Sequence, residues 1–276
     1  MRIALITSRP DPASMNMRQR ILQNFEFRRS EQNFAGIELY EILQGEARIS
    51  LYTLEKRHIF VDNLHESIDA DLFVVLSTHR SESKKPALTV HSIGNFGKAE
   101  HGGMDRAICE TNALFIRNYF LALQKRKHEV LGYDITMEAT HHGPYIEKPL
   151  VYVEIGATEK EWQDAHAARI AVECVMETIG KLEAHGIKVA AGIGGLHYCD
   201  NFNRFVEKHH VAFAYVCPKY AIKHLTIEML QQMQEKGKVD FFLLDWKGLG
   251  QDKQFLLDLL EKSGVAWKRN DQYQEV

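Results

Sequence analysis

Hydrophobic residues recur along the chain with two different spacings, one typical of strands and the other of helices. Ile135, Met137 and Ala139 occupy every second position, as in a strand with one buried face. Residues 73–76 form a continuous apolar run, which is typical of a strand covered on both faces. Residues 158–161 match a capping box and start the longest apolar stripe at helical spacing. The pattern predicts strands at residues 2–7, 37–42, 47–53, 71–76, 135–139, 150–155, 187–193, 211–216, 239–244 and 265–268, and helices at 14–25, 111–127, 158–184, 226–236 and 252–263.

The order of these elements predicts the fold class. Strands that alternate with helices are typical of a three-layer α/β/α architecture, here with a largely parallel or mixed central sheet. A chain of 276 residues suits one large α/β domain or two small ones. No stretch rich in proline, glycine or serine divides the chain, and no internal repeat is visible. We therefore predict a single domain over residues 1–276.

Composition narrows the class of protein. Apolar residues make up 45% and charged residues 26%, as in ordinary globular proteins. The net charge of −3 excludes a globally basic nucleic-acid binder. RNA could still contact local basic segments, although each is better explained as a solvated helix end or loop: residues 84–85, 125–127 and 208–210.

Membrane and secretion signals are not apparent in the sequence. No apolar run approaches the roughly 20 residues that cross a bilayer. The apolar part of residues 1–10 is too short for a signal peptide and is better explained as the first strand. The four cysteines are scattered without a CxxC pair, which argues against a disulfide framework or a cysteine zinc site. We expect a cytoplasmic protein with reduced thiols, without an obligate protein partner and monomeric.

Polar residues gather where predicted strands end. The strand at 135–139 runs into a His-His-Gly-Pro turn, which cannot continue a sheet because proline lacks a backbone donor. Other strands end in polar or glycine-rich segments at 77–80, 154–158 and 192–197. Ligands of open α/β sheets bind outside the carboxyl ends of the strands. We therefore expect six side chains to converge: His79, His91, His141, His142, Glu154 and His197.

Two kinds of chemistry fit such a cluster. Imidazoles and a carboxylate are suitable ligands for zinc, and they are equally suited to general acid–base catalysis near neutral pH. The spacing does not decide between them, and any single histidine could instead have a structural hydrogen-bonding role. Since adjacent residues tend to point apart, we expect one of His141 and His142 to face the site and the other to brace it. P-loop, GxSxG and dinucleotide-binding signatures are absent, so no nucleotide cofactor is predicted.

Residues 86–103 differ from their surroundings. Thr89 and His91 share one face of a short strand, and four glycines follow within ten residues. Glycine lets backbone amides approach a ligand closely, and successive free amides form anion-binding concavities. The alternative is a long surface loop.

Six segments in combination resemble the archaeal and plant type of D-aminoacyl-tRNA deacylase: PALTVHSIGNFG (86–97), EATHHGP (138–144), VEIGATEKEW (153–162), GIGGLHY (192–198), PKYA (218–221) and DWKG (245–248). The resemblance implies a fold like that of peptidyl-tRNA hydrolase and the nucleoside phosphorylases. It also implies zinc as cofactor, the acceptor end of D-aminoacyl-tRNA as partner, and hydrolysis of the ester between a D-amino acid and tRNA. After Tyr198 this chain has Cys199-Asp200, where Ala-Pro is expected in relatives.

Candidate roles follow from this chemistry. Hydrolysis of an aminoacyl ester requires an activated water and a stabilised oxyanion. The candidate catalytic residues are His91, His141, His142 and His197. The candidate metal ligands are His79, His142, Glu154 and His197. The candidate substrate-binding residues are Thr89, Gly94, Asn95, Phe96, Gly97, Gly194, Gly195 and Tyr198.

Within the substrate-binding set, Phe96 and Tyr198 could stack on the terminal adenosine or be packed in the core. Glycine-lined walls at 94–97 and 194–195 predict that L-aminoacyl esters are rejected by backbone and steric exclusion. Two alternatives stay open: a hydrolase or phosphorylase acting on nucleosides, and a non-catalytic RNA-binding module. Histidines at strand ends disfavour the second, because an RNA binder needs basic and aromatic residues but few titrating ones.

Overall fold

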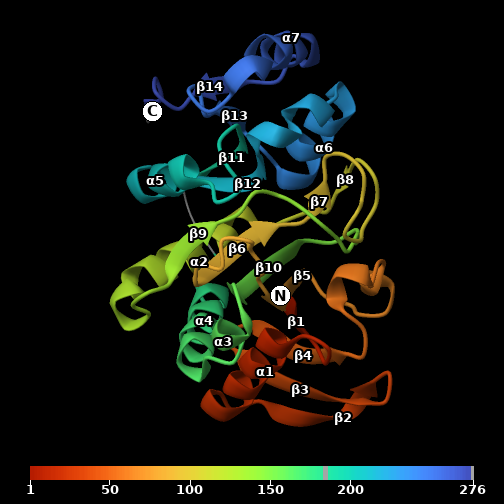
Figure 1. Cartoon of the computed structure of the whole chain (residues 1–276). Helices are drawn as coiled ribbons and strands as arrows, with labels where there is room; N and C mark the ends of the chain where they lie inside the picture. Colours follow the sequence, from red (N-terminus) through yellow and green to blue (C-terminus); the bar gives the residue numbers. More distant parts are fainter. Residues whose placement is uncertain (183–185, 275–276) are drawn as a thin grey trace.

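The computed structural model of the chain describes residues 1–182 and 186–274. Its strands form two main sheets, where the sequence predicts a single central one. The larger sheet has the order β2-β3-β4-β1-β5-β10-β6-β9, and the smaller has the order β12-β11-β13-β14. In Figure 1 the N-terminal strands lie in the lower half and β11 to β14 in the upper half, with β6 and β9 between them.

The larger sheet is mixed, which confirms the prediction of a parallel or mixed sheet. β4, β1, β5 and β10 are parallel neighbours, as are β6 and β9. β10 and β6 pair antiparallel, and so do β2, β3 and β4. The strands are β1 (Arg2–Ser8), β2 (Arg28–Phe34), β3 (Ile37–Gln44), β4 (Ala47–Leu54), β5 (Leu72–Thr78), β6 (Ala87–Ser92), β9 (Asp134–Met137) and β10 (Leu150–Gly156).

The smaller sheet is parallel throughout, as expected for strands joined by helical crossovers. Its strands are β11 (Lys188–Ile193), β12 (Val211–Cys217), β13 (Phe241–Leu244) and β14 (Trp267–Arg269). A short two-stranded sheet of β7 (Gly94–Asn95) and β8 (Ala107–Ile108) lies in the glycine-rich segment.

Helices cover one face of the larger sheet and flank the smaller one (Figure 1). α1, α3 and α4 contact the larger sheet, while α2 contacts β6 and β9 as well as β12 of the smaller sheet. The helices are α1 (Pro12–Asn24), α2 (Ala113–Lys125), α3 (Glu159–Trp162), α4 (Ala165–Ile179), α5 (Asp200–Lys208), α6 (Ile227–Gly237) and α7 (Lys253–Ser263). Short 3-10 helices are η1 (His58–Phe60), η2 (Leu64–Glu66), η3 (Lys127–Glu129), η4 (Lys219–His224) and η5 (Gly250–Asp252).

Two helix predictions need correction. The helix predicted over 158–184 is interrupted after Trp162, because Asp164 caps a new helix by accepting from the backbone amides of His166 and Ala167. Its predicted end at residue 184 lies outside the described residues. α1 begins at Pro12, before the predicted start at residue 14, because Asp11 caps it: the Asp11 side chain accepts from the Ser14 amide and Pro12 occupies the first helical position.

The two faces of the larger sheet are buried differently. Val151, Val153 and Ile155 of β10 pack into the core under the helices, while Leu150 and Tyr152 belong to a smaller core on the opposite face. Glu154 therefore projects from that opposite face, since side chains alternate along a strand. No helix within the described ranges is long and apolar enough to span a membrane.

Candidate active site

Buried polar side chains gather at the ends of β5, β9 and β10 and on β6. His79 follows β5, His91 is on β6, and Glu154 is on β10. Glu154 pairs in register with Thr89, and His91 with Tyr152, so all four side chains share the sheet face that the helices leave open. His79, His91 and Glu154 are at most 3% exposed. Strand register alone thus brings together residues more than 60 positions apart.

The His-His turn after β9 adds two more imidazoles. His142 has a left-handed backbone conformation, with φ of 47°. This bend turns both rings inward, so that the centroids of His141 and His142 lie 4.4 Å apart and that of His141 lies 4.4 Å from His91. The expectation that only one of the pair faces the site is therefore wrong. The position after the two histidines must be glycine, because a Cβ on Gly143 would lie 2.2 Å from the Gly103 amide nitrogen.

Two buried carboxylates lie at the base of the cluster. His79 Nδ1 is 3.0 Å from Glu138 Oε1 and 3.4 Å from Glu154 Oε2. Burial opposes the charge on His79, but these carboxylates outweigh it and raise the His79 pKa to about 12. Burial likewise opposes ionisation of Glu138, yet His197 and His79 hold its pKa well below the usual range. Both partners are therefore charged at neutral pH.

A chain of polar contacts crosses the cluster from one tyrosine to another. The Tyr198 hydroxyl is 2.9 Å from His79 Nε2. On the other side, His197 Nε2 is 2.8 Å from Glu138 Oε2, and His197 Nδ1 is 3.1 Å from the Tyr220 hydroxyl. Because a carboxylate can only accept, Nε2 of His197 donates, and Nδ1 of a neutral His197 accepts from Tyr220. The His197 side chain is 33% exposed and lies at the opening of the cluster.

His91, His141 and His142 share one hydrogen-bonding pattern. Their Nδ1 atoms lie 3.1, 2.8 and 2.6 Å from the backbone oxygens of Ser92, Ala139 and Gly143, respectively. A carbonyl oxygen only accepts, so this geometry assigns the proton of each neutral ring to Nδ1 and leaves Nε2 with a lone pair. At His91, burial opposes the charge, but the neighbouring Glu154 carboxylate outweighs it and raises the His91 pKa, which favours a second proton on Nε2. Burial, with a smaller contribution from His91, lowers the pKa of His142 to about 4. Burial also places the His141 pKa well below its usual range.

Potential metal-ligand atoms fall into three overlapping groups. In each, the ligand atoms lie within 4.8 Å of one another: His91 with His141 and His142, Glu138 with His141 and His197, and His79 with Glu138 and Glu154. Among the described residues, the predicted ligand set of His79, His142, Glu154 and His197 does not appear as one such group. That set stays a prediction.

Two pockets reach the cluster. The glycine-loop pocket has a volume of about 580 Å³ and is lined by Gly94, Asn95, Phe96, Gly97, His141 and Tyr220, among others. The lysine pocket has a volume of about 640 Å³ and is lined by Lys85, Lys127, Thr136, His197, Tyr198 and Tyr220, among others. Tyr220 lines both pockets.

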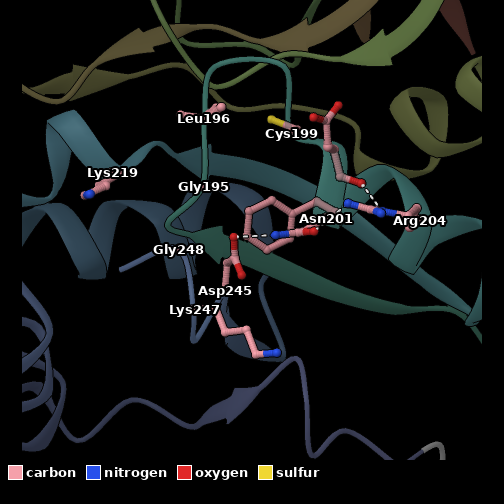
Figure 2. A pocket seen from close by; sticks show the side chains of 11 residues that line it. Gly195, Leu196, Cys199, Asn201, Arg204, Lys219, Asp245, Lys247 and Gly248 are labelled. Carbon is pink, nitrogen blue, oxygen red and sulfur yellow. Dashed lines mark hydrogen bonds between the residues drawn. The ribbon is translucent and has the colours of Figure 1, made fainter. Parts of the chain in front are cut away.

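A third pocket lies at the carboxyl ends of β11 and β13, and Figure 2 shows it from close by. Its volume is about 350 Å³. The buried Asp245 carboxylate accepts from Asn201 Nδ2 at 2.7 Å, and Gly195 lies beside it. A Cβ on Gly195 would lie 3.2 Å from Asp245 Oδ2. We call this the Asp245 pocket; it shares Leu196 and Asp200 with the lysine pocket.

Comparison with known proteins identifies the family. The sequence profile of the D-aminoacyl-tRNA deacylase family matches residues 66–268. The D-aminoacyl-tRNA deacylase of Methanococcus vannielii is 33% identical, covering 98% of this chain and all of that protein. The chain belongs to the D-aminoacyl-tRNA deacylase family. The enzyme of that name from Pyrococcus furiosus is 35% identical, covering 95% of this chain and 98% of its own.

A solved structure supports the fold assignment of this deacylase. The crystal structure of a conserved protein described as being of unknown function superposes with a TM-score of 0.88 at 29% identity, covering 99% of this chain and 96% of the other. The two chains therefore share the architecture over nearly their whole length.

The deacylase fold brings the six predicted site residues together. His79, His91, His141, His142, Glu154 and His197 all belong to the cluster. Among the substrate-binding candidates, Gly94, Asn95, Phe96 and Gly97 line the glycine-loop pocket and Tyr198 the lysine pocket. Gly195 lines the separate Asp245 pocket. Gly194 lies beside Asp245, because a Cβ added to Gly194 would be 3.2 Å from the Asp245 Cβ.

Two candidate side chains are deeply buried. Phe96 is 4% exposed and packs into the core of the smaller sheet, which favours the packing alternative for its ring. Thr89 is fully buried under the cluster, and its hydroxyl has no hydrogen-bond partner. Their predicted roles in substrate binding stay predictions.

Sequence reasoning missed Glu138 and Tyr220. Glu138 lies between Met137 and Ala139, two positions expected on the buried face, so a position on the outer, solvated face was the natural assignment. A signal was available, since a carboxylate three residues before His141 ends a strand within the EATHHGP segment. Tyr220 lies in the PKYA segment, 23 positions from His197, and nothing local indicates their contact.

Proposed function

We propose that this chain hydrolyses the ester bond between a D-amino acid and the terminal adenosine of tRNA, consuming one water and releasing the free amino acid and tRNA. Membership of the deacylase family supports this reaction. The observation that carries it is the buried cluster of imidazoles and carboxylates that opens onto two pockets through His141 and His197. An ester placed over the cluster has room for its acyl group in one pocket and its alcohol group in the other.

We further propose that the site holds zinc. Nε2 of His91 is buried and has no hydrogen-bond partner, while Nδ1 of His91, His141 and His142 each contacts a backbone carbonyl. Metal-bound histidines are usually oriented in this way, by a hydrogen bond from the other ring nitrogen. These three residues would hold the ion, which would polarise the ester carbonyl and lower the pKa of a water molecule. The alternative ligand set is His79, His142, Glu154 and His197.

His197 is the proposed general base. Its Nε2 is fixed by Glu138, so Nδ1 is the basic atom, and the partly exposed ring lines the lysine pocket. The attacking water must take the place of the Tyr220 hydroxyl at Nδ1. Nδ1 takes a proton from the attacking water, and Glu138 stabilises the resulting imidazolium. The imidazolium then returns the proton to the ribose oxygen as the ester bond breaks. His79, held in the charged form by two carboxylates, fixes the orientation of Glu138.

Backbone amides are the proposed oxyanion donors. Gly97 lines the same pocket as His141. The Gly194 amide is less suitable, because it already donates to the Cys217 backbone oxygen at 2.9 Å. The Gly94 amide also donates, to the His141 backbone oxygen at 3.4 Å, so within the 94–97 segment we favour the Gly97 amide for stabilising the tetrahedral oxyanion.

The test is a comparison of three substrates: D-tyrosyl-tRNA, L-tyrosyl-tRNA and free nucleosides. We expect hydrolysis of the D-ester alone. Cleavage of nucleosides would instead support the nucleoside hydrolase or phosphorylase, and tRNA binding without any hydrolysis would support a binding module. Since tRNA charging takes place in the cytoplasm, we propose that the protein acts there, and as a monomer; light scattering after gel filtration tests the latter.

A further inference from the structure

Two basic segments that are far apart in sequence meet at the lysine pocket. Lys85 lies in the segment before β6, and Lys127 begins η3 after α2, yet both line this pocket. Both residues are exposed. Within residues 1–182 and 186–274, neither forms an ion pair. Two unpaired ammonium groups beside the catalytic cluster form a suitable site for phosphate oxygens.

Other residues that line the lysine pocket can contact the base and the ribose of a nucleotide. Tyr220 is 59% exposed, and its hydroxyl contacts His197, so one end of a largely open ring is fixed in place. Exposed aromatic rings provide stacking surfaces for unpaired bases. Asp134 and Asp200 also line the pocket and can accept from ribose hydroxyls or the adenine amino group.

The positions of the two pockets relative to the cluster divide the ester between them. The lysine pocket reaches His197 and the glycine-loop pocket reaches His141, and the centroids of these two rings are 4.6 Å apart. A scissile bond over the two rings must therefore place its alcohol part in one pocket and its acyl part in the other.

We propose that the lysine pocket binds the terminal nucleotide of the tRNA acceptor end, with Lys85 and Lys127 at its phosphates and the ring of Tyr220 under its base. The D-aminoacyl group then occupies the glycine-loop pocket. This assignment rests on the proposed function and deepens it, since it gives each half of the substrate its own pocket.

The test compares three double variants, each of which removes two positive charges. Lys85→Ala/Lys127→Ala removes the proposed phosphate contacts. Lys84→Ala/Lys125→Ala is the matched control, because these neighbours do not line the pocket. Lys98→Ala/Arg106→Ala removes the two basic residues of the glycine-loop pocket and tests the opposite assignment.

The substrates are D-tyrosyl-tRNA and D-tyrosyl-adenosine, an ester that has no phosphate. For D-tyrosyl-tRNA we expect the Lys85/Lys127 variant to raise KM roughly tenfold or more and to reduce the slope of log KM against log salt concentration by about 1.4, or 0.7 per phosphate contact. The matched control should stay within about twofold of the parent. KM for D-tyrosyl-adenosine should be unchanged in the Lys85/Lys127 variant and in the matched control.

Three results would overturn the assignment. KM for D-tyrosyl-tRNA could rise equally in the variant and the matched control, it could rise only when Lys98 and Arg106 are replaced, or D-tyrosyl-adenosine could be impaired as much as the tRNA ester. If the parent hydrolyses neither ester, the dissociation constant of uncharged tRNA is measured for the same variants. Binding that depends on Lys85 and Lys127 would then support the pocket while refuting the proposed function.

Variants of Tyr220 test the contact with the base independently of the phosphate contacts. Tyr220→Ala should raise KM for D-tyrosyl-adenosine about tenfold, the value of one base–aromatic stack, and Tyr220→Phe, which keeps the ring but loses the contact with His197, should raise it less than Tyr220→Ala does. An unchanged KM in the alanine variant would show that the base does not stack on Tyr220.

Discussion

Glu138 is the residue on which the imidazoles of the site converge. One of its oxygens is 2.8 Å from His197 Nε2 and 3.9 Å from His141 Nε2, while the other is 3.0 Å from His79 Nδ1. The carboxylate is buried, so its charge is compensated by neighbouring side chains rather than by water. The orientation of His197 therefore depends on a single charged group.

Glu138→Gln should lower kcat for D-tyrosyl-tRNA by about 10²-fold or more with little change in KM, because the amide keeps the shape but cannot stabilise an imidazolium. Single-turnover kinetics measure this loss. Glu177→Gln, which alters an exposed pair with Lys181, is the control and should retain the parent rate. A kcat within threefold of the parent would show that Glu138 is structural.

The imidazoles give a second prediction at this scale. Alanine replacement of His91, His142 or His197 should reduce turnover 10²-fold or more, which is roughly 2.7 kcal/mol of barrier, while the melting temperature falls much less. His166→Ala, on the exposed side of α4, is the control. Variants that keep both the melting temperature and a near-normal rate would identify these histidines as structural.

Single residues were the best-predicted part of the site. Polar side chains at strand ends have no packing reason to be there, and that is why six cluster members could be named from sequence. Whether His141 and His142 both face inward depended on the left-handed backbone of His142, a conformation that histidine adopts only in a specific turn. Such a conformation leaves no periodic pattern in the sequence.

At the scale of elements, α1 is held to the larger sheet by its cap. Asp11 accepts from the Ser14 amide of α1, from the amide and hydroxyl of Thr78 on β5, and lies 3.2 Å from His58 Nε2. Burial opposes ionisation of this carboxyl, but the contacts with His58 and Thr78 outweigh it, so its pKa is lowered. The stability that Asp11 supplies is therefore present above pH 4 and is lost as the pH falls through the folded-state pKa.

Asp11→Asn should lower the free energy of unfolding at pH 7 by about 1–3 kcal/mol, because the buried hydrogen bonds lose their charged acceptor. The difference between parent and variant should shrink as the pH falls below about 4, because the carboxyl of the unfolded parent takes up a proton there before the folded one does, and it should be lost once the pH has passed the folded-state pKa. Urea unfolding at several pH values between 3 and 7 measures both effects. Asp258→Asn on α7 is the exposed control, and a difference that is independent of pH would refute the charge argument.

The glycine segments give a prediction about chirality. Gly97→Ala should lower hydrolysis of D-tyrosyl-tRNA about 10-fold or more without admitting the L-ester, since its added methyl takes up space in the pocket that His141 also lines. Its Cβ would meet His224 at 3.4 Å, an ordinary contact, so the variant should fold. Gly195→Ala should instead cost about 1 kcal/mol of stability, because φ is 76° there.

Rates of L- and D-tyrosyl-tRNA hydrolysis check this prediction. If Asn95→Ala allows the L-ester to be cleaved, chirality is read by a side chain and the backbone hypothesis fails. Gly195→Ala with reduced turnover at unchanged stability would extend the site to the Asp245 pocket.

Elements with strong periodicity were predicted well and polar ones were not. The hairpin of β3 and β4 and the buried strands β5 and β10 agree with their apolar patterns. β2 was missed because its residues are mostly exposed and polar, as befits an edge strand. The interruption after Trp162 was missed because the apolar stripe continues through it, and the cap at Asp164 acts only once α3 has ended.

For the whole molecule, the first prediction concerns metal. Chelator treatment should abolish hydrolysis of D-tyrosyl-tRNA, and added zinc should restore it. Zinc content after dialysis should fall in His91→Ala, His141→Ala and His142→Ala, whereas the alternative set predicts a loss in His79→Ala and His197→Ala. Full activity in a rigorously metal-free preparation would exclude a metal requirement.

The division into two sheets was beyond sequence reasoning. Both sheets are built from buried apolar strands with similar composition, and pairing partners are set by tertiary contacts that periodicity does not encode. A single domain remains the prediction, and α2, which contacts strands of both sheets, shows how closely the two are joined.

The contact between Glu138 and His197 spans that junction. Glu138 directly follows β9 of the larger sheet, while His197 belongs to the turn after β11 of the smaller one. The site therefore depends on the relative position of the two sheets, and the turnover rate reports whether the contact between Glu138 and His197 is intact. A small rotation of one sheet relative to the other would separate His197 from Glu138 while both sheets remained folded. On heating, inactivation should then precede the loss of secondary structure, and mutations along the α2–β12 contact should widen the interval between the two.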